Sequence, residues 1–133
     1  MKHATADAAE TEFYRAFAEG DLPGMLRVWA ESETVICVHP GQESLSGRAS
    51  VLESWRDILG SDNRFDIAYQ CMERHESGDL ALHTGLEHLR MDDERVATLT
   101  VTNGYRRTGD GWRMVLHHAA PVHAAAAPEG PVH

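Results

Sequence analysis

The sequence predicts an α+β fold in which three helices near the N-terminus pack on a curved, mostly antiparallel β-sheet. Apolar residues recur at helical spacing through much of residues 7–59, and four strand-like segments separated by short polar turns follow from residue 64. Helices followed by a run of strands are typical of α+β domains, and 133 residues are enough to bury one core. We therefore expect a single domain over residues 1–121.

Two helices are expected to form a hairpin at the N-terminus. Residues 7–18 place Phe13 and Phe17 near one helical face together with several alanines, and Gly20 ends this pattern. Asp21 is a residue type that caps helices, and the second helix tolerates Pro23 in its first turn.

A short strand and a third helix are expected next. Residues 34–38 are β-branched and apolar, and Pro40-Gly41 ends the run, which places His39 at the end of a strand. From Ser46, a polar cap, apolar residues that include Trp55 recur at helical spacing until the turn at residues 60–63.

Four strands of similar length are predicted at residues 64–74, 80–90, 95–107 and 112–120. The turns between them are short and polar, so the strands should form an antiparallel meander. Helices that cover one face of such a sheet leave a conical cavity between the two layers. Residues 122–133 are low in complexity and are expected to form a disordered tail.

Composition argues against several classes of partner. The net charge is −9, whereas binding to nucleic acid requires a basic face. No window approaches the roughly 18 consecutive apolar residues of a membrane span, so a membrane partner is not expected. The first residues lack the apolar core of a secretory signal, and two cysteines make no disulfide framework. We therefore expect a cytoplasmic location.

Neither a cofactor nor a metal is expected from the motifs. The glycines form no GxGxxG or GxxxxGK[ST] spacing, which argues against nucleotide cofactors. The sequence also lacks HxH, HExxH and CxxC, and the adjacent His117 and His118 cannot both bind one metal from a regular strand. Cys37 and Cys71 have no neighbouring base in sequence and are interpreted as buried apolar side chains.

The order of these elements resembles the NTF2-like superfamily, and its SnoaL-like proteins in particular. The resemblance covers residues 8–121 and rests on Gly20-Asp21, on Trp29 before the first strand, on His39-Pro40 after it, on Gly47 before the third helix and on His117-His118. The resemblance implies a cone-shaped α+β fold. The similar proteins are small bacterial members of the superfamily whose activity is unassigned.

Within that superfamily, ketosteroid isomerases place a catalytic Asp before a Pro at the end of the first long strand, and the matching residue here is His39. Their oxyanion hole pairs a tyrosine of the first helix with a protonated Asp on a late strand. These positions correspond to Phe13, which has no donor, and Asn103, whose amide can donate. Tyr14 is adjacent but lies about 100° further around the helix, so steroid isomerisation itself is not supported.

The candidate catalytic residues are therefore His39, Asn103 and His118. An imidazole that titrates near neutral pH suits proton abstraction, although a structural histidine bonded to a backbone carbonyl would give the same pattern. Asn103 shares a strand face with apolar residues, as either a structural amide or a ligand contact. Strict alternation in the last strand places His118 with Met114 on the cavity side and His117 on the other.

The candidate substrate-binding residues are the aromatic side chains Phe13, Tyr14, Trp29 and Trp55, which lie on predicted helix faces. The same placement is typical of core residues, and both roles stay open. A pocket lined by large rings with a few polar groups is the usual form of a site for a small hydrophobic molecule.

Two functions stay open at this stage. One is cofactor-free acid–base chemistry of the isomerase, cyclase or dehydratase type on a small hydrophobic oxygenated metabolite, with His39 as the base and Asn103, helped by His118 or Tyr14, as the oxyanion donor. The other is a non-catalytic binding protein or a dimeric assembly module. A homodimer through the outer face of the sheet is expected, because apolar and threonine side chains such as Thr100 occupy both faces of the late strands.

Overall fold

A computed structural model of the chain describes residues 2–61 and 66–122. The helices are α1 (Ala6–Glu19), α2 (Leu22–Val28) and α3 (Arg48–Leu59), and the strands are β1 (Ile36–Val38), β2 (Leu45–Ser46), β3 (Asp66–Ser77), β4 (Leu80–Met91), β5 (Glu94–Thr108) and β6 (Gly111–Pro121). The predicted α+β class is confirmed. The start of the predicted strand at residues 64–74 and residues 123–133 of the predicted tail lie outside the described residues.

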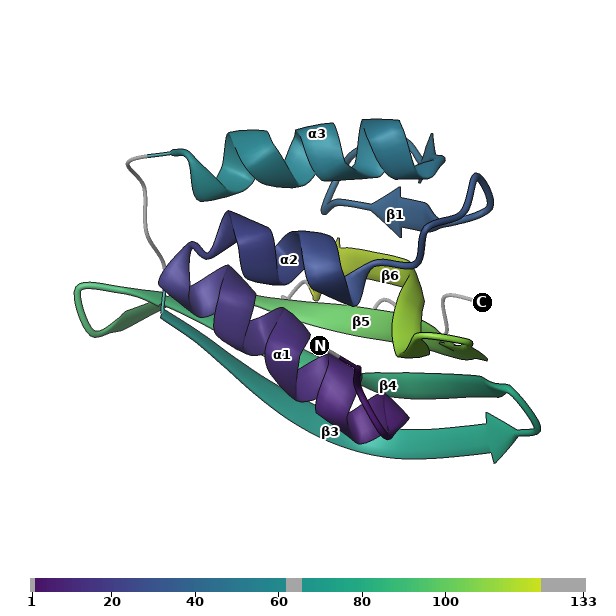
Figure 1. Ribbon diagram of the computed structural model, residues 1–133. Coiled ribbons are helices and arrows are strands. Elements are labelled where there is room, and N and C mark those ends of the chain that lie inside the picture. The colour runs from purple at the N-terminus through teal and green to yellow at the C-terminus, as the bar shows by residue number, and fades with distance from the viewer. Residues whose placement is uncertain (1, 62–65, 123–133) are drawn as a thin grey trace.

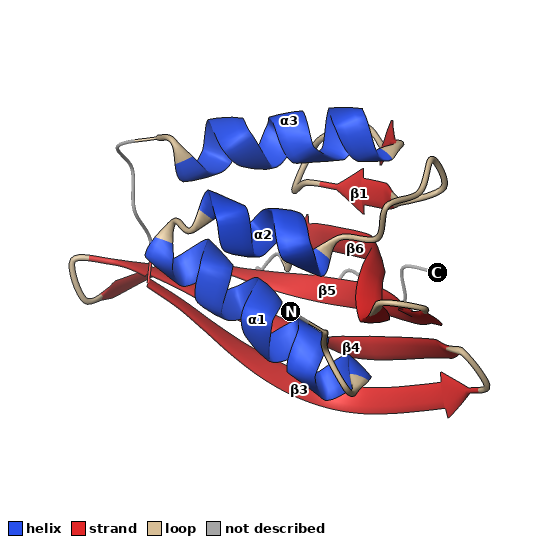
Figure 2. Ribbon diagram, viewed as in Figure 1, coloured by secondary structure: helices blue, strands red, loops and turns tan. Residues whose placement is uncertain are grey.

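The six strands form one sheet in the order β2-β1-β6-β5-β4-β3. The neighbours are antiparallel except for β1 and β6, which run parallel with Cys37 opposite His117. Figure 1 shows the three helices on one side of the curved sheet, and Figure 2 shows the resulting helix and strand layers. The β1–β6 pairing brings His39 and the His117-His118 segment to the same part of the sheet.

Capping residues mark both ends of α1 and the start of α2, and Gly20 and Asp21 act there as the sequence predicts. The Thr5 hydroxyl accepts a hydrogen bond from the backbone N–H of Ala8, and Gly20 ends α1 in the left-handed region at φ 68°. The Asp21 carboxylate accepts from the N–H of Gly24 at the start of α2. These local bonds fix the hairpin that packs α1 against the sheet.

The third helix begins differently from the prediction. Ser46 does not cap it but lies in β2, a short strand that the sequence pattern missed, and Gly47 is the N-cap residue with no side-chain hydrogen bond. Gly47 adopts φ 90°, which side chains rarely tolerate, so glycine permits the abrupt change from β2 into α3.

Bulges interrupt the long strands. The β5–β6 register shifts where Gly104 lies opposite Leu116 and Tyr105 lies opposite Met114, so Val115 is the extra residue on β6. Before the bulge Met114 faces inward, and after it His117 does, while His118 faces outward. One inserted residue therefore reverses the side-chain alternation for the rest of the strand.

Strand β4 has the opposite of the usual polarity pattern. Ala81, His83 and Glu87 on its inner face are each no more than 3% exposed, whereas Leu80 and Leu82 on its outer face are 45% and 42% exposed. In this part of β4, His83 and Glu87 thus point toward the helices, whereas Leu80 and Leu82 point away from them. The inner polar groups need hydrogen-bond partners, and the outer leucines leave an apolar surface.

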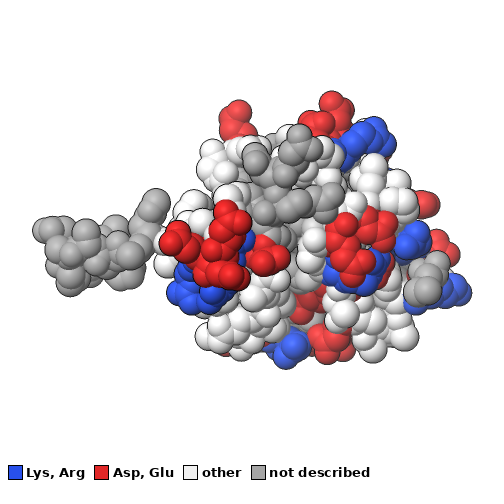
Figure 3. Space-filling model, turned by 90° about the vertical axis from the view of Figure 1, so that its left-hand side faces the viewer, with Lys and Arg blue, Asp and Glu red and all other residues white. Residues whose placement is uncertain are grey.

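Charged side chains of both signs lie beside one another on the surface in Figure 3, with no extended Lys and Arg patch on that face. Among the described residues, no helix is long and apolar enough to cross a membrane.

Candidate functional site

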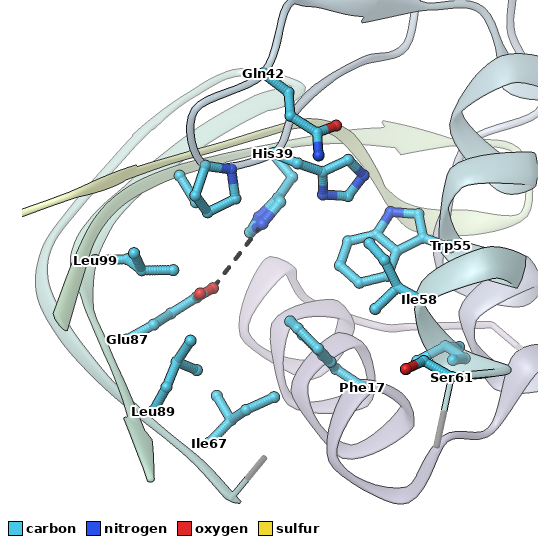
Figure 4. A pocket seen from close by; sticks show the side chains of 14 residues that line it. Phe17, His39, Gln42, Trp55, Ile58, Ser61, Ile67, Glu87, Leu89 and Leu99 are labelled. Carbon is cyan, nitrogen blue, oxygen red and sulfur yellow. Dashed lines mark ion pairs between the residues drawn. The ribbon is translucent and has the colours of Figure 1, made fainter. Parts of the chain in front are cut away.

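A pocket of about 340 Å³, here called the α3 pocket, lies between α3 and the sheet. Figure 4 shows Ile67, Leu89 and Leu99 from the sheet on one side, facing Phe17, Trp55 and Ile58 from the helices. The remaining lining residues are His39, Pro40, Gln42, Leu59, Ser61, Glu87, His117 and Ala119. The walls are therefore mostly apolar, with one carboxyl group and two imidazoles among the polar groups.

Glu87 brings a buried carboxyl group to the wall of this pocket. Its side chain is 1% exposed, and burial raises its pKa to about 7, even though a hydrogen bond from the Tyr14 hydroxyl, 2.7 Å from Oε2, opposes the shift. A carboxyl group with such a pKa exchanges its proton near neutral pH. This is the property expected of a general acid or base.

A chain of hydrogen bonds leads from Glu87 to His117. The Asn103 amide nitrogen donates to the Tyr14 oxygen at 2.9 Å, and the Asn103 amide oxygen lies 2.7 Å from His117 Nδ1. Because an amide oxygen only accepts, His117 Nδ1 is the donor and Nε2 carries the lone pair. That Nε2 atom lies 3.9 Å from Glu87 Oε2, as the dashed line in Figure 4 marks.

His117 is held as a neutral imidazole. Burial lowers its pKa to about 3, and the neighbouring His39 and His118 act in the same direction. A neutral ring whose Nδ1–H is fixed by Asn103 offers Nε2 as a hydrogen-bond acceptor at the pocket wall. Asn103 therefore orients this tautomer.

His39 lies where the sequence predicted, after β1 and at the α3 pocket. Its Nε2 atom is 2.9 Å from the Ser54 hydroxyl, which itself donates to the Val51 carbonyl oxygen at 2.6 Å. His39 Nε2 must therefore donate, which leaves Nδ1 as its basic nitrogen. Burial lowers the pKa of His39 from its ordinary value. The neighbouring Cys37 is also buried, which raises the pKa of its thiol to about 12, so it is no nucleophile.

Two expectations about the polar residues need correction. His118 is exposed and His117 lines the pocket, because the bulge at Val115 reverses the alternation assumed for β6. Asn103 is fully buried but is not among the described residues that line the α3 pocket, since its amide is engaged by Tyr14 and His117. Asn103 therefore orients Tyr14 and His117.

Comparison with known proteins identifies the family. Residues 7–124 match the SnoaL-like domain family. The chain belongs to that family. Its similarity to solved structures agrees with this assignment, because NTF2-like and ketosteroid isomerase-like proteins share its fold.

Two bacterial structures resemble this SnoaL-like domain in both sequence and fold. A candidate calcium/calmodulin-dependent protein kinase type II association domain from Thiobacillus denitrificans is 38% identical, with a TM-score of 0.88 over 92% of this chain and 99% of that one. A candidate dehydratase of the NTF2-like family from Streptomyces avermitilis is 34% identical, with a TM-score of 0.80 over 89% of this chain and 94% of that one.

A ketosteroid isomerase-like protein from Erwinia carotovora shares the fold at 18% identity, with a TM-score of 0.68 over 89% of this chain and 94% of that one. The F-box protein SKIP8 of Arabidopsis thaliana is 27% identical over 113 residues, which are 85% of this chain and 48% of SKIP8. The chain thus spans about half the length of this curated relative.

The aromatic candidates of this SnoaL-like domain lie at different depths. Trp55 lines the α3 pocket, where its ring contacts His39 edge-on at 5.0 Å between centroids. Phe13 is fully buried behind it and contacts Trp55 and His117. Tyr14 holds Glu87, and Trp29 lies in the core beside β6. Phe13, Tyr14 and Trp29 are therefore not among the described residues that line this pocket.

The residue that sequence reasoning missed is Glu87. The signal was its parity with Ala81, His83 and Gly85, which share one face of β4. Leu80, Leu82 and Leu86 of the same strand share the other face, and a hydrophobic pattern would assign that face to the core. Glu87 reaches the pocket because the face of β4 that carries it packs toward the helices, which the sequence pattern does not indicate.

Proposed function

We propose that this SnoaL-like domain binds a small hydrophobic oxygenated molecule in the α3 pocket and catalyses cofactor-free proton transfer on it, of the isomerase, cyclase or dehydratase type. The observation that carries the proposal is Glu87, a buried carboxyl group at the pocket wall with a pKa of about 7. Near neutral pH such a group is present in both protonation states and can take a proton or give one.

In this mechanism the Glu87 carboxylate accepts a proton from a carbon next to a carbonyl group of the substrate. The protonated Glu87 then returns the proton, either to another carbon, which isomerises the substrate, or to a departing hydroxyl group, which leaves as water. The Tyr14 hydroxyl, 2.7 Å from Oε2, stabilises the carboxylate while it is ionised.

The two histidines have different roles around that proton. His117 presents Nε2 as a hydrogen-bond acceptor for a substrate hydroxyl, because Asn103 holds the hydrogen on Nδ1. His39, with Nε2 donating to Ser54, presents Nδ1 as a second base. The role that the sequence assigned to His39 alone is thus divided between Glu87 and His39.

The substrate class follows from the pocket walls. Side chains such as Ile67, Leu89 and Leu99 favour an apolar molecule, while the three ionisable groups require oxygen atoms on it. A structure described as a candidate dehydratase is 34% identical to this chain, which supports a hydroxy-carbonyl substrate.

Hydrogen–deuterium exchange tests the proposal without knowledge of the full reaction. The protein is incubated in D₂O with a panel of small β-hydroxy and α,β-unsaturated carbonyl compounds, and exchange at their carbon-bound hydrogens is followed by NMR. We expect exchange that increases with an apparent pKa near 7 and falls by at least about 100-fold in Glu87→Gln, as is typical for loss of a general base.

The matched control is Glu73→Gln, which removes an exposed carboxyl group of β3 and should leave the exchange rate unchanged. Exchange that survives in Glu87→Gln would exclude Glu87 as the base. Binding of a panel compound without any exchange would support the non-catalytic alternative.

An assembly function is the second candidate, and the outer face of β4 favours it. Leu80 and Leu82 lie exposed on the sheet surface away from the helices, and Thr100 lies on the same face of β5. We propose that a second copy of the chain covers this surface in a homodimer, because two-fold pairing of identical faces is the commonest closed assembly. The resemblance to a candidate association domain supports an assembly role.

A further inference from the structure

A second group of polar side chains lies on the far side of Tyr14 from the α3 pocket. It consists of Glu10 on α1, Cys71 on β3 and His83 on β4, here called the α1–β3–β4 cluster. One oxygen, one sulfur and one nitrogen atom of these residues all lie within 4.8 Å of one another. Glu10 and His83 are buried, at 5% and 3% exposure, and Cys71 is half-buried.

We propose that Glu10, Cys71 and His83 bind a divalent transition-metal ion of the zinc class. A carboxylate, a thiolate and an imidazole are the three side-chain ligand types of zinc sites, and a fourth position is then left for water. Neither the α3 pocket nor its proton chemistry is involved, so the proposal is independent of the proposed function.

The geometry of the cluster fits such an ion. His83 Nδ1 is hydrogen-bonded to Glu10 Oε2 at 2.9 Å, so binding through Nδ1 requires the ring hydrogen to move to Nε2. The two atoms then need to separate only to about 3.3 Å, the spacing of two ligands with bonds of about 2.0 Å to a tetrahedral zinc ion. The Tyr105 hydroxyl donates to the same Glu10 oxygen at 2.9 Å. In metal sites, carboxylate ligands are commonly held in place by such hydrogen bonds from neighbouring residues. Small side-chain movements therefore suffice to close the site.

Local charge favours a divalent ion. The Asp7 carboxylate lies 3.8 Å from His83 Nε2 and is paired with Arg74 at 2.9 Å. The carboxylates of Glu10 and Asp7 thus face the guanidinium of Arg74 alone among these side chains, and a cation bound beside them is attracted in a partly buried setting, where charges interact strongly.

Two further features indicate a ligand here. A cavity of about 380 Å³ is lined by Glu10 and Cys71 together with Thr11, Tyr14, Tyr69 and Arg74, and it gives an ion and a water molecule access. The Tyr69 hydroxyl is buried in this cavity beside Glu10 and Cys71, where it can donate to a metal-bound water.

No spacing motif marks this site, because each ligand comes from a different element. The sequence search for HxH, HExxH and CxxC therefore predicted no metal. Strands β3 and β4 bring Cys71 and His83 together through their antiparallel pairing, and α1 adds Glu10 from above the sheet. The bulge between Cys71 and Glu73 sets the local register of β3 beside the thiol.

Cobalt(II) chloride is the probe that tests the site. Protein purified in a chelator and then freed of it is titrated with Co²⁺, and we expect a near-ultraviolet thiolate-to-cobalt absorption band that saturates at one ion per chain and disappears when Zn²⁺ is added. Cys71→Ser should abolish the band. Cys37→Ser, which removes the other cysteine, should leave it unchanged.

Replacement of the other ligands gives a second measurement. Glu10→Gln and His83→Gln should each weaken Co²⁺ binding by more than about 10-fold, the loss seen even for outer-shell partners. The matched control His75→Gln removes an exposed histidine of β3 and should have no effect. If a ligand variant fails to fold, protection of Cys71 from alkylation by Zn²⁺ in the wild-type protein, measured by mass spectrometry, decides the matter.

Absence of the band in the wild-type protein, its persistence in Cys71→Ser, or equal alkylation of Cys71 with and without Zn²⁺ would each overturn the proposal.

Discussion

The stability of the protein should depend on pH through Glu87, and Glu87→Gln exposes this dependence. The pKa of Glu87 rises from its ordinary value of 4.5 to about 7 in the folded protein because the carboxyl group is buried. The folded state therefore holds this proton more tightly than the unfolded state does. Its contribution to stability is present below pH 4.5 and is lost as the pH rises through 7.

The size of the effect follows from the shift. One pKa unit corresponds to about 1.4 kcal/mol, so a shift from 4.5 to about 7 corresponds to about 3 kcal/mol. The glutamine side chain that replaces Glu87 does not titrate, and its amide oxygen can still accept from Tyr14. Relative to the wild type, the free energy of unfolding of Glu87→Gln should therefore rise by about 3 kcal/mol between pH 4.5 and pH 8.

Urea denaturation followed by tryptophan fluorescence measures this difference at a series of pH values. Leu89→Val, a non-titrating change in the same pocket, is the control and should shift stability by the same amount at every pH. A Glu87→Gln protein that instead loses stability relative to the wild type as the pH rises would refute the reasoning. That result would show an ionised Glu87 stabilised by a protonated His117.

Three further predictions concern other parts of the fold. Burial lowers the pKa of His117 to about 3. The neutral ring therefore contributes up to about 5 kcal/mol to stability, and this contribution is lost as the pH falls from 6.5 toward 3. The urea midpoint of His117→Gln should accordingly decrease less in acid than that of the wild type. Gly85→Ala should lower the free energy of unfolding by about 1–3 kcal/mol, because the added Cβ would clash with the backbone carbonyl oxygen of Gln70 and lie 2.9 Å from the Tyr69 ring. Gly109→Ala meets nothing within 4 Å and should change thermal denaturation little. Leu82→Arg should convert the proposed dimer to a monomer in sedimentation, and a wild-type monomer near 14.7 kDa would argue against the dimer itself.

The sequence by itself determined where the helices lie and which segments form strands. Gly20 and Asp21 mark the boundary between α1 and α2 because a left-handed glycine and a capping carboxylate act within a few residues of backbone. His39 could be placed at the end of β1 for the same reason, since Pro40 stops a strand locally. The order of helices and strands, and the position of His39 at the end of β1, were therefore predictable from short stretches of chain.

Which face each side chain occupies was decided by the tertiary structure. The bulge at Val115 exchanges the roles of His117 and His118, and it depends on the pairing of β6 with β5. Glu87 lies inside because β4 turns Leu80 and Leu82 outward, against the hydrophobic pattern of that part of the strand. Alternation along a strand tells which side chains share a face of the sheet. Which of the two faces packs against the helices is decided by strand pairing and by bulges. The meeting of Glu87 with His117, and of Glu10 with Cys71 and His83, is a consequence of those long-range contacts.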